Sequence, residues 1–214
     1  MERPEIDLYL IRHAECLMNT RPELIGGRSD DSPLSDNGKL EAALLGDRLK
    51  YKKIKFDEVY SSTAIRAIQT ANISCRKLGF KLEKIVESAA LLELSQGDYE
   101  GKLRKDIHIP TVIAKMEKEH WDFSAPNGES QRQVEDRMYD EISEKLLLKY
   151  PVRLKVGIYT HGLAIKCLFR KIMNSDPRLT YKIEINNTSI TRFKYNERGW
   201  NLITLNDTAH LYNK

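Results

Sequence analysis

The 214-residue sequence is poor in cysteine and has no long apolar run. Its three cysteines, Cys16, Cys75 and Cys167, form no CxxC pair, so we expect no disulfide framework and a reducing, cytoplasmic location. Residues 1–7 are polar and lack the apolar core of a signal peptide. No apolar run approaches the roughly 20 residues that cross a bilayer. A membrane partner is therefore not expected.

Several phosphate-binding and nucleic-acid-binding patterns are also missing. The sequence has no GxxxxGK[ST] loop, which argues against a P-loop nucleotide site. No cysteine precedes an arginine by six positions, and Cys16 stands one position too close to Arg21 for a cysteine-phosphatase motif. The net charge of +4 is spread along the chain without a basic, aromatic-rich block. A nucleic-acid partner is therefore not expected.

The composition that is present fits one soluble α/β domain. Apolar residues make up 41% and charged residues 31% of the chain, as in folded globular proteins. The pattern predicts strands at 8–11, 57–60, 84–86, 154–160, 182–185, 189–195 and 200–205. It predicts helices at 36–52, 129–149 and 161–173, one ending near 78, and a helical excursion at 102–127. This alternation favours a mainly parallel sheet that helices cover on both faces.

Charged side chains follow three of the predicted strands. The first strand ends at Arg12 and His13, the second runs into a helix whose first turn holds Arg66, and the strand before the last long helix ends at His161. Ligands of open α/β sheets bind beyond the carboxyl ends of the strands, so we expect these residues to converge. Arginines, histidines and helix N-termini suit a phosphate, and they are unlike the carboxylate and thiolate ligands of zinc or magnesium. We therefore predict no metal and no organic cofactor.

The ordered motifs of this chain resemble the histidine phosphatase superfamily, in its phosphoglycerate mutase-like branch. They cover nearly the whole chain: Leu10-Ile11-Arg12-His13-Ala14-Glu15 with Asn19, Ser35 to Gly38, Ser61 to Ala71, Glu93 with Gly97 and Tyr99 to Gly101, Pro126 to Ser130, Thr160 to Gly162, Asn187 to Ile190 and Leu205 to Asp207. The resemblance implies a single domain over residues 1–214 with a small cap around 102–127, called the cap segment below. It also implies a three-layer sandwich around a six-stranded sheet, mainly parallel with one antiparallel edge strand.

The resemblance also implies a role for each matching residue. His13 would be the nucleophile that forms a phosphohistidine, with its other ring nitrogen donating to a backbone carbonyl. Glu93 would protonate the leaving oxygen and then activate water, which requires a protonated carboxyl group in the first step. The remaining matches would bind phosphate or substrate: Arg12, Arg66, His161, Asn19, Ile25, Gly26 and Gly162.

Two positions depart from the family pattern. Cys16 stands where Ser or Thr is usual, and a thiol is a weaker hydrogen-bond donor to phosphate. A thiol beside a cationic pocket is also open to oxidation. Ala14 replaces the commoner glycine, which is a milder change.

Trp121 and Phe123 could line the substrate pocket or pack in the core, whereas His108, His120 and His210 lack a motif and are expected on the surface.

The sequence leaves the reaction open between three alternatives. A phosphomonoester hydrolase acting on a small phosphorylated metabolite is favoured, because only residues 94–128 separate Glu93 from Glu129. A phosphoglycerate mutase usually carries a longer insertion there, which excludes water. The third alternative is a non-catalytic phospholigand-binding relative. Residues 24–29 are similar to a loop of fructose-2,6-bisphosphatase and the size to α-ribazole phosphatases, and the chain could be a monomer or a homodimer.

We expect phosphatase activity to persist in excess EDTA, because guanidinium and imidazole groups are the predicted phosphate ligands. The rate of phosphate release with and without EDTA measures this, with a zinc-dependent phosphatase as the control. Complete loss of activity that a divalent metal restores would contradict the prediction.

Overall fold

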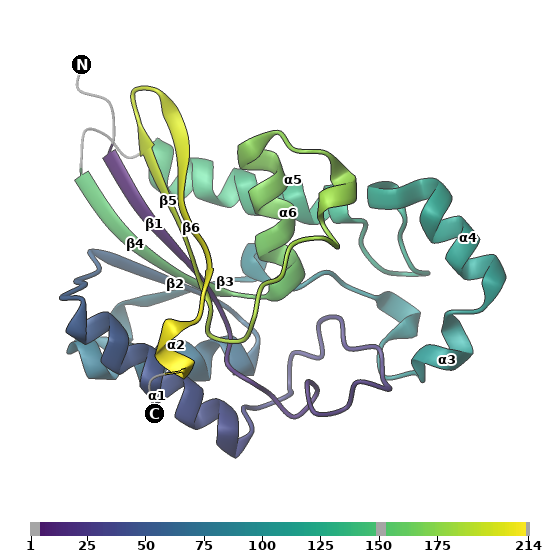
Figure 1. Ribbon diagram of the computed structural model, residues 1–214, viewed down its shortest axis with the longest axis horizontal. Coiled ribbons are helices and arrows are strands. Elements are labelled where there is room, and N and C mark those ends of the chain that lie inside the picture. The colour runs from purple at the N-terminus through teal and green to yellow at the C-terminus, as the bar shows by residue number, and fades with distance from the viewer. Residues whose placement is uncertain (1–4, 149–152, 213–214) are drawn as a thin grey trace.

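Six strands form one mixed sheet at the centre of the protein (Figure 1). The computed structural model describes residues 5–148 and 153–212. The strands are β1 (Glu5–Arg12), β2 (Glu58–Ser62), β3 (Ile85–Ser88), β4 (Arg153–Thr160), β5 (Ile190–Asn196) and β6 (Gly199–Asp207). Their order in the sheet is β3-β2-β4-β1-β5-β6. The mainly parallel α/β fold is thus confirmed.

One detail of the predicted sheet is wrong. The strand that runs against the others is β5, which pairs antiparallel with both β1 and β6. It therefore lies one place in from the edge. The reason is local: β5 and β6 form a hairpin, so the chain reverses twice and β6 becomes the edge strand, parallel in direction to β1.

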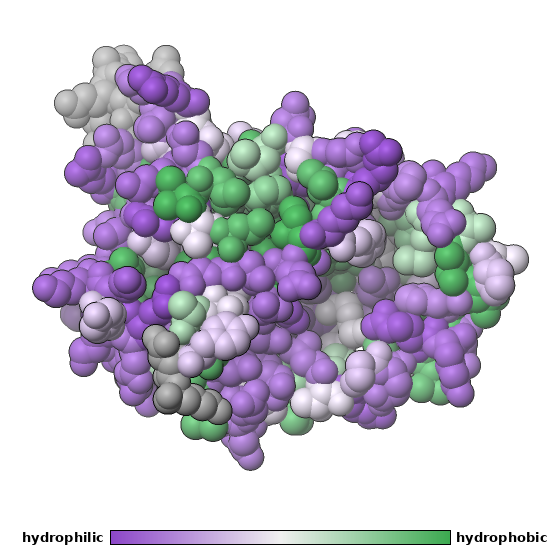
Figure 2. Space-filling model, in the orientation of Figure 1, coloured by the Kyte–Doolittle hydropathy of each residue, from purple (hydrophilic) through white to green (hydrophobic). Residues whose placement is uncertain are grey.

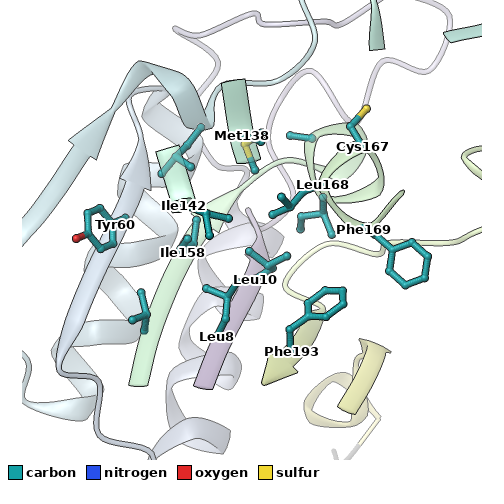
Figure 3. Packing of buried hydrophobic residues seen from close by; sticks show 14 of the residues in the cluster. Leu8, Leu10, Tyr60, Met138, Ile142, Ile158, Cys167, Leu168, Phe169 and Phe193 are labelled. Carbon is teal, nitrogen blue, oxygen red and sulfur yellow. The ribbon is translucent and has the colours of Figure 1, made fainter. Parts of the chain in front are cut away.

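Helices cover both faces of the sheet (Figure 1). One face carries α1 (Asp36–Tyr51) and α2 (Ile65–Leu78), and the other carries α5 (Gln131–Ile142) and α6 (Gly162–Met173). Alternate side chains of β1 point to opposite faces, as a pleated strand requires. Leu8 and Leu10 join the core under α5 and α6 (Figure 3), whereas Tyr9 and Ile11 join the core under α1 and α2.

The cap segment holds α3 (Arg104–Ile107), α4 (Pro110–Glu119) and the 3₁₀ turn η4 (His120–Asp122), so the expected helical excursion is confirmed. Figure 1 shows α3 and α4 to one side of the sheet. Trp121 packs this segment against α5 and α6. The centroid of its ring lies 3.9 Å from the guanidinium carbon of Arg132 and 5.0 Å from that of Arg170. The remaining short helical turns are η1 (Leu82–Lys84), η2 (Ala89–Leu91), η3 (Gly97–Tyr99), η6 (Pro177–Leu179) and η7 (Ala209–Leu211).

Two predicted elements differ in the structure. The strand expected at 182–185 is irregular backbone, and the Ile185 carbonyl accepts a 2.6 Å hydrogen bond from the Arg12 guanidinium instead of pairing in a ladder. The helix expected at 129–149 starts later, after a Ser130–Gln133 capping box, and continues beyond Ile142 as a π-helical turn, η5 (Ser143–Leu147). Its expected last residue, Lys149, lies outside the described residues. Over 5–148 and 153–212, no helix combines the length and apolarity needed to cross a bilayer.

The start of α1 packs directly on the loop that follows β1. Ser35 caps the helix by accepting from the Gly38 N–H at 3.0 Å, and its own N–H donates to the Glu15 carbonyl. A Cβ atom at Gly38 would overlap that same Glu15 carbonyl oxygen. Gly38 is therefore required by a close backbone approach.

We expect Gly38→Ala to destabilise the protein by about 2 kcal/mol, because overpacking against backbone outweighs the better helix propensity of alanine. Urea unfolding measures the change. The neighbouring exposed residue provides the control, since Lys39→Ala should stay within about 0.5 kcal/mol of the parent. Equal stability of Gly38→Ala and parent would contradict the expected overlap.

Candidate active site

The candidate nucleophile, His13, directly follows β1 and is 4% exposed. Its backbone N–H donates to the Thr160 carbonyl at the end of β4. In its ring, Nδ1 lies 2.7 Å from the Ala14 carbonyl oxygen, and Nε2 lies 3.1 Å from Nε of Arg66. Arginine can only donate, so Nε2 accepts and Nδ1 carries the ring hydrogen. This tautomer presents the Nε2 lone pair that a nucleophile needs.

Arg66 joins the two histidines of the site. It lies in the first turn of α2 and is 3% exposed. Its Nη2 contacts Nδ1 of His161 at 3.0 Å, and its Nη1 donates to the Ser29 carbonyl at 2.8 Å. The ring centroids of His13 and His161 are 5.1 Å apart. The strand-end residues therefore converge as the sequence predicts.

His161 is the N-cap residue of α6 and is fully buried. Because Arg66 donates to its Nδ1, the opposite nitrogen Nε2 carries the hydrogen and donates to Oγ of Ser62 at 2.8 Å. Burial holds the pKa of both His13 and His161 well below 6.5, and the charge on Arg66 lowers each further. The site thus combines neutral imidazoles with guanidinium cations.

Arg12 approaches the site through a gap left by Gly162. Its Nη1 donates to the Ile185 carbonyl, and its buried Nε has no hydrogen-bond partner among the described residues. A Cβ atom at Gly162 would stand 3.3 Å from this Nε, so glycine leaves room for the guanidinium. Gly162 thus makes room for Arg12, and its own binding role stays a prediction. A buried N–H donor on a cation suits an anionic ligand.

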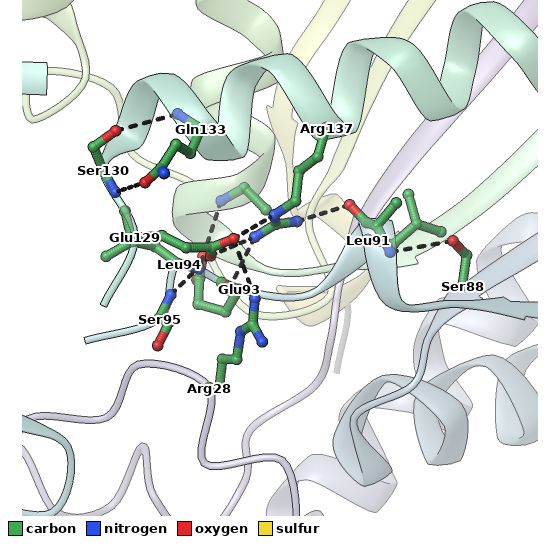
Figure 4. Close-up of polar contacts among 12 residues, drawn as sticks. Arg28, Ser88, Leu91, Glu93, Leu94, Ser95, Glu129, Ser130, Gln133 and Arg137 are labelled. Atoms are coloured by element: carbon green, nitrogen blue, oxygen red, sulfur yellow. Dashed lines mark hydrogen bonds and ion pairs between the residues drawn. The ribbon is translucent and has the colours of Figure 1, made fainter. Parts of the chain in front are cut away.

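Glu93 caps the N-terminus of α6. Its Oε1 accepts from the backbone N–H groups of Leu94 and Ala164, each at 3.0 Å, and its Oε2 accepts from that of Leu163 at 3.1 Å. Figure 4 shows Glu93 beside Leu94 and Arg137, and the Glu93 carbonyl accepts from Arg137 Nη2 at 3.1 Å. The sequence singles out Glu93 as a candidate acid but does not reveal these backbone donors. They hold the carboxyl group at the helix end that His161 begins.

A cluster of salt bridges around Glu129 lies beside Glu93 (Figure 4). The Glu129 carboxylate lies 3.0 Å from Arg137 Nε and 3.1 Å from Arg28 Nη2, and it accepts from the Ser95 N–H at 3.1 Å. Arg28 and Arg137 stand outside the predicted site. Glu129 lies in the Pro126 to Ser130 motif, which is the signal that could have pointed to this cluster.

Glu100 organises the loop that faces Arg66. Its carboxylate accepts from the backbone N–H groups of Arg28 at 3.0 Å, Ser29 at 3.3 Å and Gln96 at 2.8 Å. The carbonyls of Ser29 and of Gly27 are thereby turned toward the Arg66 guanidinium. Glu100 also belongs to a motif that the sequence analysis quotes without a role.

The residues of the expected phosphate loop have different positions. The amide oxygen of Asn19 accepts from Cys16 N–H at 3.1 Å and from its thiol at 3.3 Å, while Asn187 binds both Asn19 and the His13 carbonyl. Cys16 is 1% exposed and sits in a small apolar cluster. Its thiol therefore positions Asn19 in this structure.

Ile25 and Gly26 form part of the loop around Arg66. Ile25 is 4% exposed, and its backbone N–H and C=O both pair with residues 101–102. This short pairing holds the loop in place. Both backbone groups of Ile25 are therefore already hydrogen-bonded within the protein. The Gly26 carbonyl accepts from Ser29 Oγ at 2.7 Å. Both residues thus shape the loop next to the Arg66 partners.

His210 was expected on the surface, and this expectation is wrong. It is 5% exposed, its Nε2 lies 2.9 Å from Oγ1 of Thr188, and burial lowers its pKa to about 4. The N–H of Thr188 in turn donates to the Arg12 carbonyl at 3.1 Å. The η7 turn, which holds His210, therefore packs against Thr188, and Thr188 packs against the end of β1. His108 and His120 lie in the cap segment with partly exposed side chains, as expected.

Comparisons with known proteins find similar sequences and similar folds. A family model described as the histidine phosphatase superfamily (branch 1) matches residues 8–208. The chain is 28% identical over 220 residues to the probable phosphoglycerate mutase GpmB of Citrobacter koseri, covering 96% of this chain and 95% of that protein. The solved structure of Bacillus stearothermophilus YhfR matches with a TM-score of 0.83 at 26% identity, covering 96% and 99% of the two chains. A putative alpha-ribazole-5'-P phosphatase from Escherichia coli matches with a TM-score of 0.79, covering 95% and 97%; at 20% identity it supports the fold alone.

We expect the His13 ring to stay neutral well below pH 6.5, because burial, Arg66 and Arg12 all lower its pKa. The unfolded chain takes up this proton near pH 6.5 and the folded chain does not. The contribution of His13 to the free energy of unfolding therefore falls as the pH drops below about 6.5. Ring ¹⁵N chemical shifts from pH 4 to 8 measure the titration, with urea-unfolded protein as reference.

The Arg66→Gln variant separates the effect of the Arg66 charge on the His13 pKa from the effect of burial. Removing the nearby cation should raise the His13 midpoint without bringing it to the unfolded reference, because burial is the larger cause. A His13 midpoint at or above the unfolded value in the parent protein would contradict the assigned environment.

Proposed function

Because the chain belongs to branch 1 of the histidine phosphatase superfamily, we propose that it hydrolyses phosphate monoesters through a phosphohistidine on His13. One observation carries the proposal: the unprotonated Nε2 of a buried His13 lies 3.1 Å from the Arg66 guanidinium. A candidate nucleophile, His13, therefore lies next to a cation, Arg66, that can stabilise phosphoryl oxygens.

In the first step, His13 Nε2 attacks phosphorus. The bond from phosphorus to the ester oxygen breaks, and that oxygen leaves with the electron pair and takes a proton from Glu93. Arg66 turns from Nε2 to the phosphoryl oxygens, and the free Nε–H of Arg12 binds them as well. The Nδ1–H bond to the Ala14 carbonyl stabilises the positive charge that develops on the imidazole ring.

In the second step, water attacks the phosphohistidine. The Glu93 carboxylate removes a proton from the water, the P–N bond breaks, and its electron pair returns to His13 Nε2. Three backbone N–H donors fix the Glu93 carboxyl group, so it stays in place through both proton transfers. Inorganic phosphate leaves and the first state of the site is restored.

The second candidate is a phosphoglycerate mutase, the activity that the name of the Citrobacter koseri relative gives as probable for that protein. The same phosphohistidine would then pass its phosphoryl group to a hydroxyl of a bound phosphoglycerate. Hydrolysis is favoured, because the connection over residues 94–128 is shorter than the insertion that phosphoglycerate mutases usually carry there to exclude water.

We expect His13→Ala to lower the rate of phosphate release by about 10³-fold or more, because the covalent route is lost. A phosphate-release assay measures the rate, and an alkaline quench with ³²P-labelled substrate traps the parent phosphohistidine. An unfolding midpoint close to that of the parent serves as the folding control. Turnover of His13→Ala at the parent rate would overturn the nucleophile assignment.

The two candidate reactions are separated in one further assay. Phosphate release and interconversion of 2- and 3-phosphoglycerate are followed together, with the bisphosphoglycerate primer present. A hydrolase releases phosphate faster than it interconverts the isomers, and the opposite ratio would favour the mutase.

A further inference from the structure

A cavity of about 340 Å³ lies between the cap segment and the first turns of α5 and α6. Its walls are mostly apolar, and the side chains that matter below are Leu94, Ile113, Met116, Trp121, Phe123 and Leu163. Figure 2 shows hydrophobic surface over the cap segment at the right of the view. Ile113, which lines the cavity, is 40% exposed. Such exposed apolar surface in a concave site is typical of ligand pockets.

The cavity lies next to the proposed proton donor, whose hydrogen-bond partners form part of its lining. Leu94 and Leu163 line it, and the backbone N–H groups of both residues bind the Glu93 carboxylate. A leaving group must place its oxygen beside Glu93 to receive a proton. The rest of that leaving group therefore extends past Leu94 and Leu163 into the cavity.

The charges around the cavity do not suit an anionic leaving group. Among its described lining residues, Arg178 is the one arginine or lysine, and its guanidinium is paired with Asp176. Glu117 adds negative charge to the lining, whereas the charge of Glu129 is paired with both Arg28 and Arg137. The carboxylate of a phosphoglycerate would thus meet mostly apolar walls and the neutral polar groups of Gln96, Gln131 and Tyr181, together with His108 and His120. Among the described lining residues, no unpaired arginine or lysine is present to replace its hydration.

We infer that the preferred substrates are phosphate monoesters of apolar alcohols, whose alkyl or aryl group fills the cavity under α4. This inference rests on the proposed hydrolase function and adds the substrate class to it. Trp121 and Phe123, which the sequence leaves between core packing and substrate binding, lie in the cavity wall.

A series of primary alkyl phosphates tests the inference, because these esters share nearly the same leaving-group chemistry. From ethyl to hexyl phosphate, kcat/KM should rise about threefold per methylene as apolar surface is buried. The value for 3-phosphoglycerate should lie at or below that of ethyl phosphate. A flat series, or 3-phosphoglycerate as the best substrate, would overturn the inference.

A pair of cap variants locates the effect. Ile113→Lys places a cation in the cavity and should lower kcat/KM for hexyl phosphate about tenfold, with ethyl phosphate changed less than about twofold. The control Ile109→Lys alters an equally exposed isoleucine of the same segment outside the cavity lining, and should leave both values within about twofold of the parent. An equal loss in both variants would contradict the assigned pocket.

Binding to His13→Ala separates failure of this inference from failure of the proposed function. If the parent neither releases phosphate nor forms phosphohistidine, the hydrolase proposal fails. The dissociation constants of the same alkyl series for His13→Ala, from calorimetry, still decide the ligand class. Tightening along the series supports the apolar pocket, and equal or weaker binding of hexyl phosphate refutes it.

Discussion

The contacts of Arg66 with two buried imidazoles are the constraint on which the rest of the site depends. A guanidinium that is 3% exposed is costly unless its N–H groups are met. Here its partners are His13 Nε2, His161 Nδ1 and backbone carbonyls of the Gly27 to Ser29 loop. These acceptors are neutral, so they satisfy the hydrogen bonds and leave the positive charge to attract an anion. The same contacts set the tautomer of each histidine.

The sheet brings these groups together by register. Arg12 of β1 lies opposite Thr160 of β4, so the next residues, His13 and His161, leave adjacent parallel strands side by side. Glu93 then binds the N-terminus of the helix that His161 begins. The candidate nucleophile His13 therefore follows a strand end, and Arg66 lies in the first turn of a helix. Glu93 lies in the irregular segment after η2, where three backbone N–H groups give it a defined position.

The two halves of the site differ in polarity. Around His13, guanidinium groups and helix ends favour an anion, whereas the cavity under α4 is largely apolar. A phosphate monoester has this same division between a charged phosphoryl group and its alcohol. In the proposed reaction, the cap segment would select the alcohol, and the residues at the strand ends would carry out the phosphoryl chemistry. Trp121 holds the cap segment in place by packing against Arg132 of α5 and Arg170 of α6.

By itself, the sequence determined the parallel α/β core and the convergence of His13, Arg66 and His161, because apolar strands and their charged ends are local patterns. Tertiary structure decided what depends on distant partners. In the irregular segment at 182–185, the Ile185 carbonyl accepts a hydrogen bond from the distant Arg12. His210 is buried beside Thr188, whose hydroxyl group contacts its ring. The Glu93 contacts and the apolar cavity form between elements that are distant in the sequence. The local hydrophobic pattern of each element therefore does not predict them.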